Sequence, residues 1–226
     1  MNSPILELTE GYVAYGPTSV LAVSHLTLRE GEIALIQGGN ATGKTSLLLS
    51  LLGAGPTFSG QILFMGRVIN GEPTYRRIQR GVRLLPQGRR AFDRLTPNQH
   101  RSLARHYLCR GDRVTAEKLT ASHDNVRHAQ RAASVLSGGE SKLMLLDSLL
   151  AGLPQLLLLD EPFAGLEPKA IENSVSRVKN CLDQGTACLV TDHTGIFLQY
   201  FPKAKVQRIR PADNIDALFH LEVSRE

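Results

Sequence analysis

A short glycine-rich segment between an apolar run and a helix-forming run is the feature that most constrains this chain. Residues 38–45 read Gly-Gly-Asn-Ala-Thr-Gly-Lys-Thr, which fits the pattern G-x-x-x-x-G-K-S/T of a phosphate-binding loop. Residues 31–37 before it predict a buried strand, and residues 44–52 after it predict a helix that ends at Gly53. The glycines therefore lie between a strand end and a helix start, which is the context that this motif requires, and an α/β fold is expected.

This loop predicts a site for a nucleotide polyphosphate such as ATP. Gly38 and Gly43 allow backbone angles that point several N–H groups at one anion, and the helix N-terminus adds its dipole. Lys44 can reach the β- and γ-phosphates, and the Thr45 hydroxyl can hold Mg²⁺. The alternative is a glycine-rich turn with an unrelated lysine, which the flanking elements argue against. The other predicted phosphate-binding residues are Gly39, Asn40, Ala41, Thr42 and Ser46.

Two carboxylates follow a second apolar run. Residues 156–159 are all leucine, and Asp160 and Glu161 come directly after them. A parallel strand covered on both faces is apolar at every position, and its carboxyl end lies where ligands bind in open α/β folds. Asp160 is therefore predicted to control Mg²⁺, and Glu161 to polarise the water that attacks the γ-phosphate. A core strand with a solvated acidic end is the alternative, and the phosphate loop makes it the weaker one.

A second glycine motif, Leu-Ser-Gly-Gly-Glu, occupies residues 136–140. With these motifs the chain resembles the nucleotide-binding subunit of an ATP-binding cassette (ABC) protein. The resemblance implies that Ser137, Gly138 and Gly139 close on the γ-phosphate of a nucleotide held by the other subunit of a dimer. Glycine N–H groups, a serine hydroxyl and a helix dipole suit that task. Ser137 and Glu140 also fit a capping box, and both interpretations can hold together.

The resemblance assigns two more residues to hydrolysis. Gln87 matches the glutamine loop of the family, which is thought to touch Mg²⁺ or the attacking water and to sense the transport partner. His193 follows the apolar residues 187–190 and matches a histidine that contacts the γ-phosphate and pairs with Glu161. A surface glutamine and a structural histidine are the alternatives. The position of each residue after a strand-like run favours the functional interpretation.

The resemblance also implies an aromatic residue that stacks on adenine. Tyr15 is preferred for this role because Gly16 follows it as in the family, and Tyr12 is the competitor. Either ring could instead pack on the core as a strand residue. Residues 164–167, Ala-Gly-Leu-Glu, match the loop through which two subunits touch.

The chain departs from the family pattern at several places. Ala41 replaces a common glycine, and its small side chain is expected to fit. Glu167 stands where many members have Asp, and residues 147–148 are Asp-Ser where Ala-Arg is common. The acidic residue bears on the electrostatics of the dimer. Residues 97–101 replace a pattern that leads to the surface facing the transport partner, so unusual partner recognition is expected. The tail lacks the usual glycine-containing hairpin.

Composition places the chain among ordinary globular proteins. Of its 226 residues 42% are hydrophobic and 21% are charged, and no apolar stretch is long enough to span a bilayer. A cytosolic location is expected, because no N-terminal signal is visible. Three cysteines without C-x-x-C spacing indicate neither a disulfide framework nor a metal site.

The net charge of +5 reflects a group of arginines around Gln87. No aromatic residues are interleaved with them, so nucleic acid is not expected as a partner. A solvated basic face is the default interpretation. The arginines are Arg76, Arg77, Arg80, Arg83, Arg89, Arg90, Arg94, Arg101 and Arg105.

The expected architecture is one domain over residues 1–226, with a P-loop ATPase core on a mostly parallel sheet. An N-terminal antiparallel β part and an inserted helical lobe complete it. About residues 1–87 and 151–226 form the ATP-binding core, and about residues 88–150 form the lobe. A helix is predicted from Pro168 to before Gly185.

The implied function is an Mg²⁺-dependent ATPase that dimerises around ATP, as a homodimer or with another ABC ATPase. It would energise transmembrane permease subunits from the cytoplasmic face of the inner membrane. Residues 86–96 are similar to branched-chain amino acid and urea-type importers, whereas residues 160–165 look more like the lipopolysaccharide-export ATPase. The substrate and the direction of transport therefore stay open.

Two other classes of ATPase share parts of this pattern. A soluble assembly ATPase of the iron–sulfur type also carries Leu-Ser-Gly-Gly-Glu, and it remains the alternative. A DNA-repair or chromosome ATPase needs a long coiled-coil insertion, for which the interval from Gln87 to Leu136 has no room.

Overall fold

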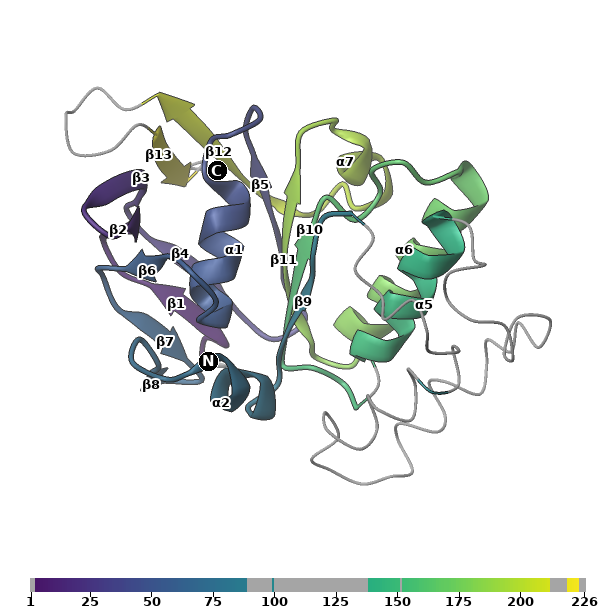
Figure 1. Cartoon of the computed structure of the whole chain (residues 1–226). Helices are drawn as coiled ribbons and strands as arrows, with labels where there is room; N and C mark the ends of the chain where they lie inside the picture. Colours follow the sequence, from purple (N-terminus) through teal and green to yellow (C-terminus); the bar gives the residue numbers. More distant parts are fainter. Residues whose placement is uncertain (1–2, 89–98, 100–137, 151, 212–218, 224–226) are drawn as a thin grey trace.

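A computed structural model describes residues 3–88, 99, 138–150, 152–211 and 219–223 (Figure 1). The strands are β1 (Leu6–Leu8), β2 (Gly11–Tyr15), β3 (Thr18–Val23), β4 (Leu26–Leu28), β5 (Ile33–Gln37), β6 (Thr57–Phe58), β7 (Ile62–Phe64), β8 (Arg67–Val68), β9 (Val82–Leu85), β10 (Leu156–Asp160), β11 (Ala187–Asp192), β12 (Lys205–Pro211) and β13 (Phe219–Val223). The helices are α1 (Lys44–Leu52), α2 (Thr74–Gln79), α5 (Gly138–Leu150), α6 (Pro168–Asp183) and α7 (Ile196–Tyr200).

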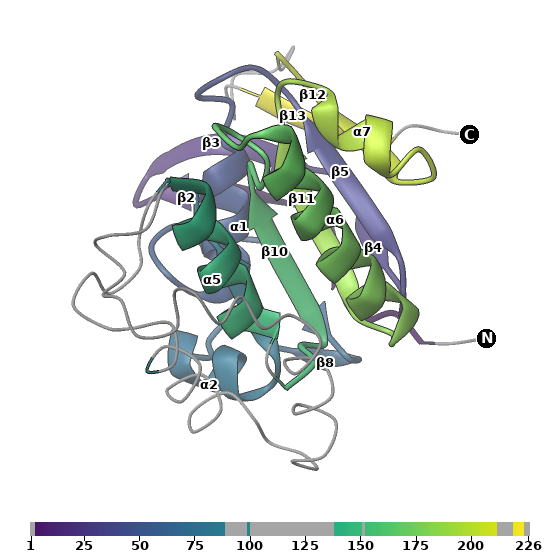
Figure 2. The same ribbon diagram turned by 90° about the vertical axis from the view of Figure 1, so that its right-hand side faces the viewer.

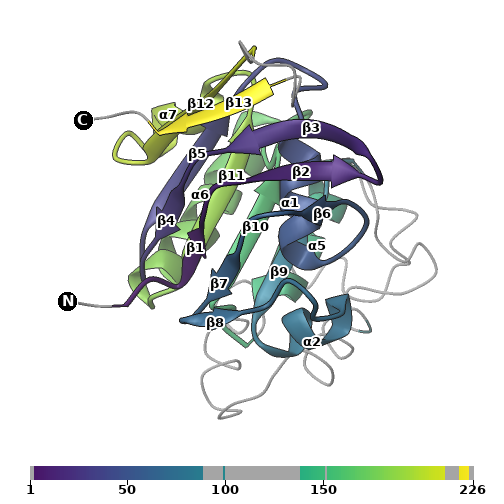
Figure 3. The ribbon, with the colours of Figure 1, turned by 90° about the vertical axis from the view of Figure 1, so that its left-hand side faces the viewer.

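A mixed sheet is the central layer of this part of the chain, with strand order β6-β2-β3-β13-β12-β5-β11-β10-β9. The five strands β12, β5, β11, β10 and β9 pair parallel with one another in this order, whereas β2 pairs antiparallel with β3 and β6. A separate antiparallel sheet has the order β4-β1-β7-β8 and contains the first strand of the chain, β1 (Figure 3). The expected α/β fold, with a parallel core and an N-terminal antiparallel part, is confirmed.

The apolar run of β10 is buried along its whole length because the parallel sheet has a hydrophobic core on each face. Leu156 and Leu158 belong to the first core, which also contains Leu47, Leu48 and Leu51 of α1. Leu157 and Leu159 belong to the second core, which contains the apolar faces of α5 and α6. Figure 1 shows α1 on one side of the sheet and α5, α6 and α7 on the other, and Figure 2 shows α5 and α6 side by side in front of β10.

Helix α1 has the limits that the sequence predicts, and a buried arginine completes its end. Gly53 caps it in a left-handed conformation with φ of 75°. Arg77, only 2% exposed, donates to the carbonyls of Ser50 and Leu51 at 2.8 and 2.9 Å. Arg83 is 4% exposed. The expectation of a solvated basic face is therefore wrong for Arg77 and Arg83, whose guanidinium groups lie in the interior.

Helix α6 also follows the sequence prediction. It begins at Pro168, and buried Ile171, Val175 and Val178 lie on its inner face. Gly185 follows its end with φ of 94°. The apolar stripe is thus explained by the second core, against which α6 packs.

The C-terminal tail differs from the expectation. β12 and β13 pair antiparallel from Gln207↔Val223 to Pro211↔Phe219, although no glycine occurs in this part of the sequence. β13 also pairs parallel with β3, so the tail joins the two halves of the large sheet.

The predicted helical lobe falls mostly on residues 89–98 and 100–137, which lie outside the described residues. Of the range 88–150, α5 is described, and it packs on β9 and α6. The division into a core and a lobe stays a prediction. Among the described residues, no helix has the length and apolar character needed to cross a bilayer.

Candidate functional site

The glycine loop connects β5 to α1 and takes backbone conformations that favour glycine. Gly43 has φ of 89°, and a Cβ added to it would lie 3.0 Å from Leu21 Cβ. Ala41 has φ of 60° and an exposed side chain. The left-handed conformation at Ala41 explains why glycine suits this position, and the exposure shows that the methyl group fits.

Lys44 is held inside the loop that contains it. It is 6% exposed, and its Nζ donates to Gly38 O at 2.9 Å and to Gly39 O at 2.6 Å. The Thr42 hydroxyl donates to the same Gly39 oxygen at 2.9 Å. Burial lowers the pKa of Lys44, and the carboxylates of Glu161, Asp160 and Asp192 oppose this. A partly desolvated ammonium at the start of a helix is suited to a phosphate group.

Asp160 connects the acidic strand end to the loop. Thr45 Oγ1 donates to Asp160 Oδ2 at 2.8 Å, and Thr191 Oγ1 donates to Asp160 Oδ1 at 2.7 Å. Asp160 is 2% exposed, whereas Thr45 is exposed to solvent. Hydroxyl and carboxylate oxygens are the ligands that Mg²⁺ prefers, so the donor set of Thr45 and Asp160 fits this ion.

Glu161 lies between the two other residues predicted for hydrolysis. His193 Nδ1 donates to Glu161 Oε1 at 2.7 Å, and Gln87 Nε2 donates to Glu161 Oε2 at 2.8 Å. Gln87, Glu161 and His193 follow β9, β10 and β11, which are adjacent parallel strands. The structure thus brings together three residues that are far apart in sequence, because the carboxyl ends of parallel strands meet at one edge.

Tyr15 lies beside the loop, at the end of β2. Its hydroxyl is 3.1 Å from Ser46 Oγ, and its side chain is 49% exposed. Tyr12 lies earlier in β2, where its backbone N–H donates to Ser59 Oγ. The exposed ring next to Ser46 makes Tyr15 the better placed of the two for stacking, and its role remains a prediction.

The second glycine motif is described in part. Ser137 lies outside the described residues, and Gly138 and Gly139 form the start of α5. A Cβ added to Gly139 would contact Ala170 Cβ and Leu166 Cδ2 at 3.6 Å. Gly139 therefore lies against the start of α6 and the predicted subunit-contact loop.

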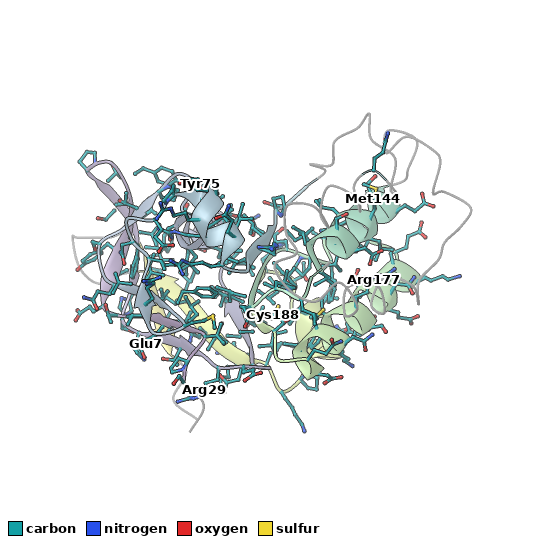
Figure 4. All side chains as sticks on the ribbon, turned by 90° about the horizontal axis from the view of Figure 1, so that it is seen from below. Glu7, Arg29, Tyr75, Met144, Arg177 and Cys188 are labelled. Carbon is teal, nitrogen blue, oxygen red and sulfur yellow. The ribbon has the colours of Figure 1, made fainter. Side chains whose placement is uncertain are left out.

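The departure at residues 147–148 has a structural explanation within the chain. Asp147 forms an ion pair with Arg177 of α6, in which Arg177 Nε donates to Oδ1 and Nη2 donates to Oδ2 at 3.3 Å. Ser148 Oγ donates to Met144 O at 2.9 Å. Figure 4 shows Arg177 on the ribbon next to the one that carries Met144. Asp147 thus has its counter-charge on the neighbouring helix.

Two residues that hold the site had no role predicted from the sequence. Thr191 is fully buried, and its Oγ1 accepts from the Glu161 backbone N–H at 3.1 Å while donating to Asp160. The sequence signal that could have identified Thr191 is a hydroxyl residue directly after the apolar residues 187–190. Lys142 of α5 donates to Glu161 O at 2.7 Å, and no local pattern distinguishes it from an ordinary surface lysine on a helix.

Comparison with known proteins agrees with this geometry. A family model described as ABC transporter matches residues 21–164. The chain belongs to the ABC transporter family. As a member it is an ATP-binding subunit, and the cassettes of this family hydrolyse ATP.

Curated relatives of this ABC protein include transport ATPases of two kinds. The high-affinity branched-chain amino acid transport ATP-binding protein BraG of Pseudomonas aeruginosa is 30% identical over 196 residues, covering 85% of this chain and 84% of BraG. The lipopolysaccharide export system ATP-binding protein LptB of Haemophilus influenzae is 30% identical over 185 residues, covering 80% and 76%. The resemblance to both groups is confirmed.

Solved structures support the fold. The structure of an ATP-binding subunit of an ABC transporter aligns with a TM-score of 0.77 at 21% identity, over 90% of this chain and 85% of that chain. The ADP conformation of MJ1267, an ATP-binding cassette of an ABC transporter, aligns with a TM-score of 0.75 at 21% identity, over 92% and 87%.

Proposed function

We propose that this ABC ATPase hydrolyses MgATP between two subunits and thereby energises a membrane transporter. The observation that carries the proposal is the arrangement around Glu161. Its carboxylate is fixed by Gln87 and His193, and Asp160 beside it is hydrogen-bonded to Thr45 of the glycine loop. Thr191 Oγ1 is bonded to both Glu161 N and Asp160 Oδ1, so a candidate base and a phosphate loop are joined in one hydrogen-bonded network.

In this mechanism the glycine loop binds the nucleotide, and residues at the carboxyl ends of the strands carry out hydrolysis. Backbone N–H groups of residues 38–46 and the Lys44 ammonium would bind the phosphates, and Tyr15 would stack on adenine. Thr45, Asp160 and Gln87 would hold Mg²⁺, which when bound neutralises phosphate charge.

Glu161 would then accept a proton from the attacking water. His193 fixes Oε1 and Gln87 fixes Oε2, so neither oxygen rotates freely. Two fixed hydrogen bonds keep the carboxylate in one orientation, which reduces the entropy lost when water is positioned for attack.

The second half of each site would come from another subunit. Ser137, Gly138 and Gly139 of the partner subunit would close on the γ-phosphate through N–H groups and a helix N-terminus. The partner is a second copy or another ABC ATPase. Binding ATP favours the closed dimer and hydrolysis releases it, so chemical energy becomes motion.

The named relatives favour a transport role. BraG and LptB are named for branched-chain amino acid transport and for lipopolysaccharide export. By analogy the chain would bind permease subunits at the cytoplasmic face of the inner membrane. These relatives give no support to the soluble assembly alternative.

Two substitutions test the proposal. Glu161→Gln should retain ATP binding, lower the hydrolysis rate by about 10²–10⁴-fold and accumulate as an ATP-bound dimer in size-exclusion chromatography with light scattering. Lys44→Ala should lose ATP binding, because the loop then lacks its phosphate-binding ammonium. Glu172→Gln, on the exposed face of α6, is the matched control. Hydrolysis by Glu161→Gln at the wild-type rate would contradict the assignment of the base.

A further inference from the structure

The turn that carries Glu161 receives a contact from a helix outside the strand ends. Lys142 of α5 donates from Nζ to Glu161 O at 2.7 Å and lies 3.4 Å from Ala164 O. Ala164 N also donates to Glu161 O at 3.2 Å, which closes the turn 161–164. One ammonium group therefore contacts the carbonyls at both ends of this turn.

Glu161 needs more restraint than an ordinary residue at a strand end. Its φ of 48° lies in the left-handed region, which residues with a Cβ adopt only where the surroundings hold them. Thr191 O and Oγ1 hold its N–H, and Gln87 and His193 hold its carboxylate. The described contacts from Gln87, Thr191 and His193 come from residues in or directly after strands. Lys142 differs because it belongs to a helix, and it contacts the remaining polar atom of Glu161, the carbonyl oxygen.

The Lys142 ammonium has little freedom to leave these carbonyls. Burial lowers the pKa of Lys142, while the carboxylates of Glu161 and Asp160 oppose this. A partly buried ammonium without hydrogen bonds is costly, so Nζ is expected to stay on the turn as long as α5 keeps its place.

We propose that Lys142 is a positioning residue that couples α5 to the carboxylate used in hydrolysis. This inference rests on the proposed function, in which the start of α5 closes on the partner's nucleotide while Glu161 serves the nucleotide of its own chain. Lys142 lies about one helical turn after Gly138. A shift of α5 on closure therefore moves the ammonium and, through it, the Glu161 turn. Each chain links the site that it completes to the site that it holds.

Steady-state kinetics of the full-length protein test this coupling. Lys142→Met keeps the aliphatic stem and removes the donor, and we expect kcat to fall about 10–100-fold while KM for ATP changes less than about twofold. The split is expected because Lys142 touches the turn of Glu161, whereas Lys44 and its loop bind the nucleotide. Lys142→Arg, which can reach the same carbonyls, should keep kcat within about threefold of wild type.

Two control variants separate positioning from general support. Lys169→Met removes an exposed lysine at the start of α6, and it should behave as wild type. Arg177→Met removes the ion pair between α5 and α6 without touching Glu161. It should therefore lower the melting temperature but leave kcat close to the wild-type value. The inference is overturned if Lys142→Met keeps the wild-type kcat, if its loss equals that of Arg177→Met, or if Lys142→Arg is as inactive as Lys142→Met.

These outcomes are distinct from failure of the proposed function. An inactive wild-type protein, or a fully active Glu161→Gln variant, would refute the hydrolytic site itself. A normal wild type with an unaffected Lys142→Met variant refutes the coupling alone.

Chemical rescue provides a second test should Lys142→Met not fold. Lys142→Cys in a Cys109→Ser background can be alkylated with 2-bromoethylamine, which rebuilds an ammonium of nearly lysine length. Burial raises the pKa of Cys181 to about 12 and also raises that of Cys188, so these thiols should stay unmodified. Recovery of at least about tenfold in kcat supports the inference, and equal recovery with neutral bromoethane overturns it.

Discussion

At the scale of single residues, buried polar side chains complete backbone groups that regular elements leave open. Arg77 is the clearest case. In addition to the two carbonyls at the end of α1, it donates to Glu72 O at 3.0 Å and to Asn70 O at 2.7 Å. Burial lowers the pKa of Arg77, and Glu72 opposes this. The guanidinium has five N–H donors in a planar fork and bonds all four carbonyls, whereas an ammonium has three donors.

Replacing Arg77 should therefore cost stability. Arg77→Met keeps most of the apolar stem but leaves buried carbonyls without donors, and we expect a loss of about 2–4 kcal/mol in the free energy of unfolding by urea titration. Arg77→Lys should recover part of the loss. Arg76→Met, at the neighbouring exposed position, should change stability by less than about 0.5 kcal/mol. Equal losses at the two positions would show that the buried hydrogen bonds do not matter.

Arg76 and Arg77 also show where prediction from sequence ended at this scale. Both lie in one short basic segment, and nothing local indicates which of them points to the end of α1. Lys44 and Glu161 could be found because each follows a recognisable apolar run. Lys142 could not, because its contact depends on how α5 packs against the turn after β10.

At the scale of elements, the predictable parts were those with strong local signals. β5, α1, β10 and α6 were predictable because glycine, proline and apolar periodicity mark their ends. The pairing of β12 with β13 was missed, because a strand pair without a turn glycine leaves no local signal. The packing of α5 on α6 could not be predicted from local sequence either, because the Asp147–Arg177 pair joins residues 30 positions apart.

A double-mutant cycle should measure how strongly α5 and α6 are joined. The Arg177 and Asp147 side chains are 11% and 30% exposed, so their pair is only partly screened by water. For Asp147→Asn and Arg177→Met we expect a coupling energy of about 1–2 kcal/mol in urea unfolding. The pair Glu32–Lys205 is the control, because Lys205 is 43% exposed, and its coupling should be below about 0.5 kcal/mol. A larger coupling for the control pair would argue against burial as the cause.

At the scale of the whole molecule, the site and the second core share the strands β10 and β11. The carboxyl ends of these strands carry Asp160, Glu161 and His193, and their middle positions pack against α5, α6 and α7. Cys181 and Cys188 belong to this core, and Figure 4 shows Cys188 in the middle of the molecule. Both thiols are buried and free, so the rate at which they react measures how often the second core opens.

Thiol labelling should therefore detect ATP binding as a global stabilisation. In a Cys109→Ser, Glu161→Gln background, the two buried thiols should react slowly with an aromatic disulfide reagent at pH 8. Their raised pKa values keep them neutral, and reaction requires opening of the second core. ATP at about 100 times its Kd should slow labelling about 100-fold, because it binds the folded form alone. Lys44→Ala in the same background should show no slowing. Labelling that ATP leaves unchanged, in a protein shown by calorimetry to bind it, would mean that the thiols react through local opening of α6 rather than through opening of the sheet.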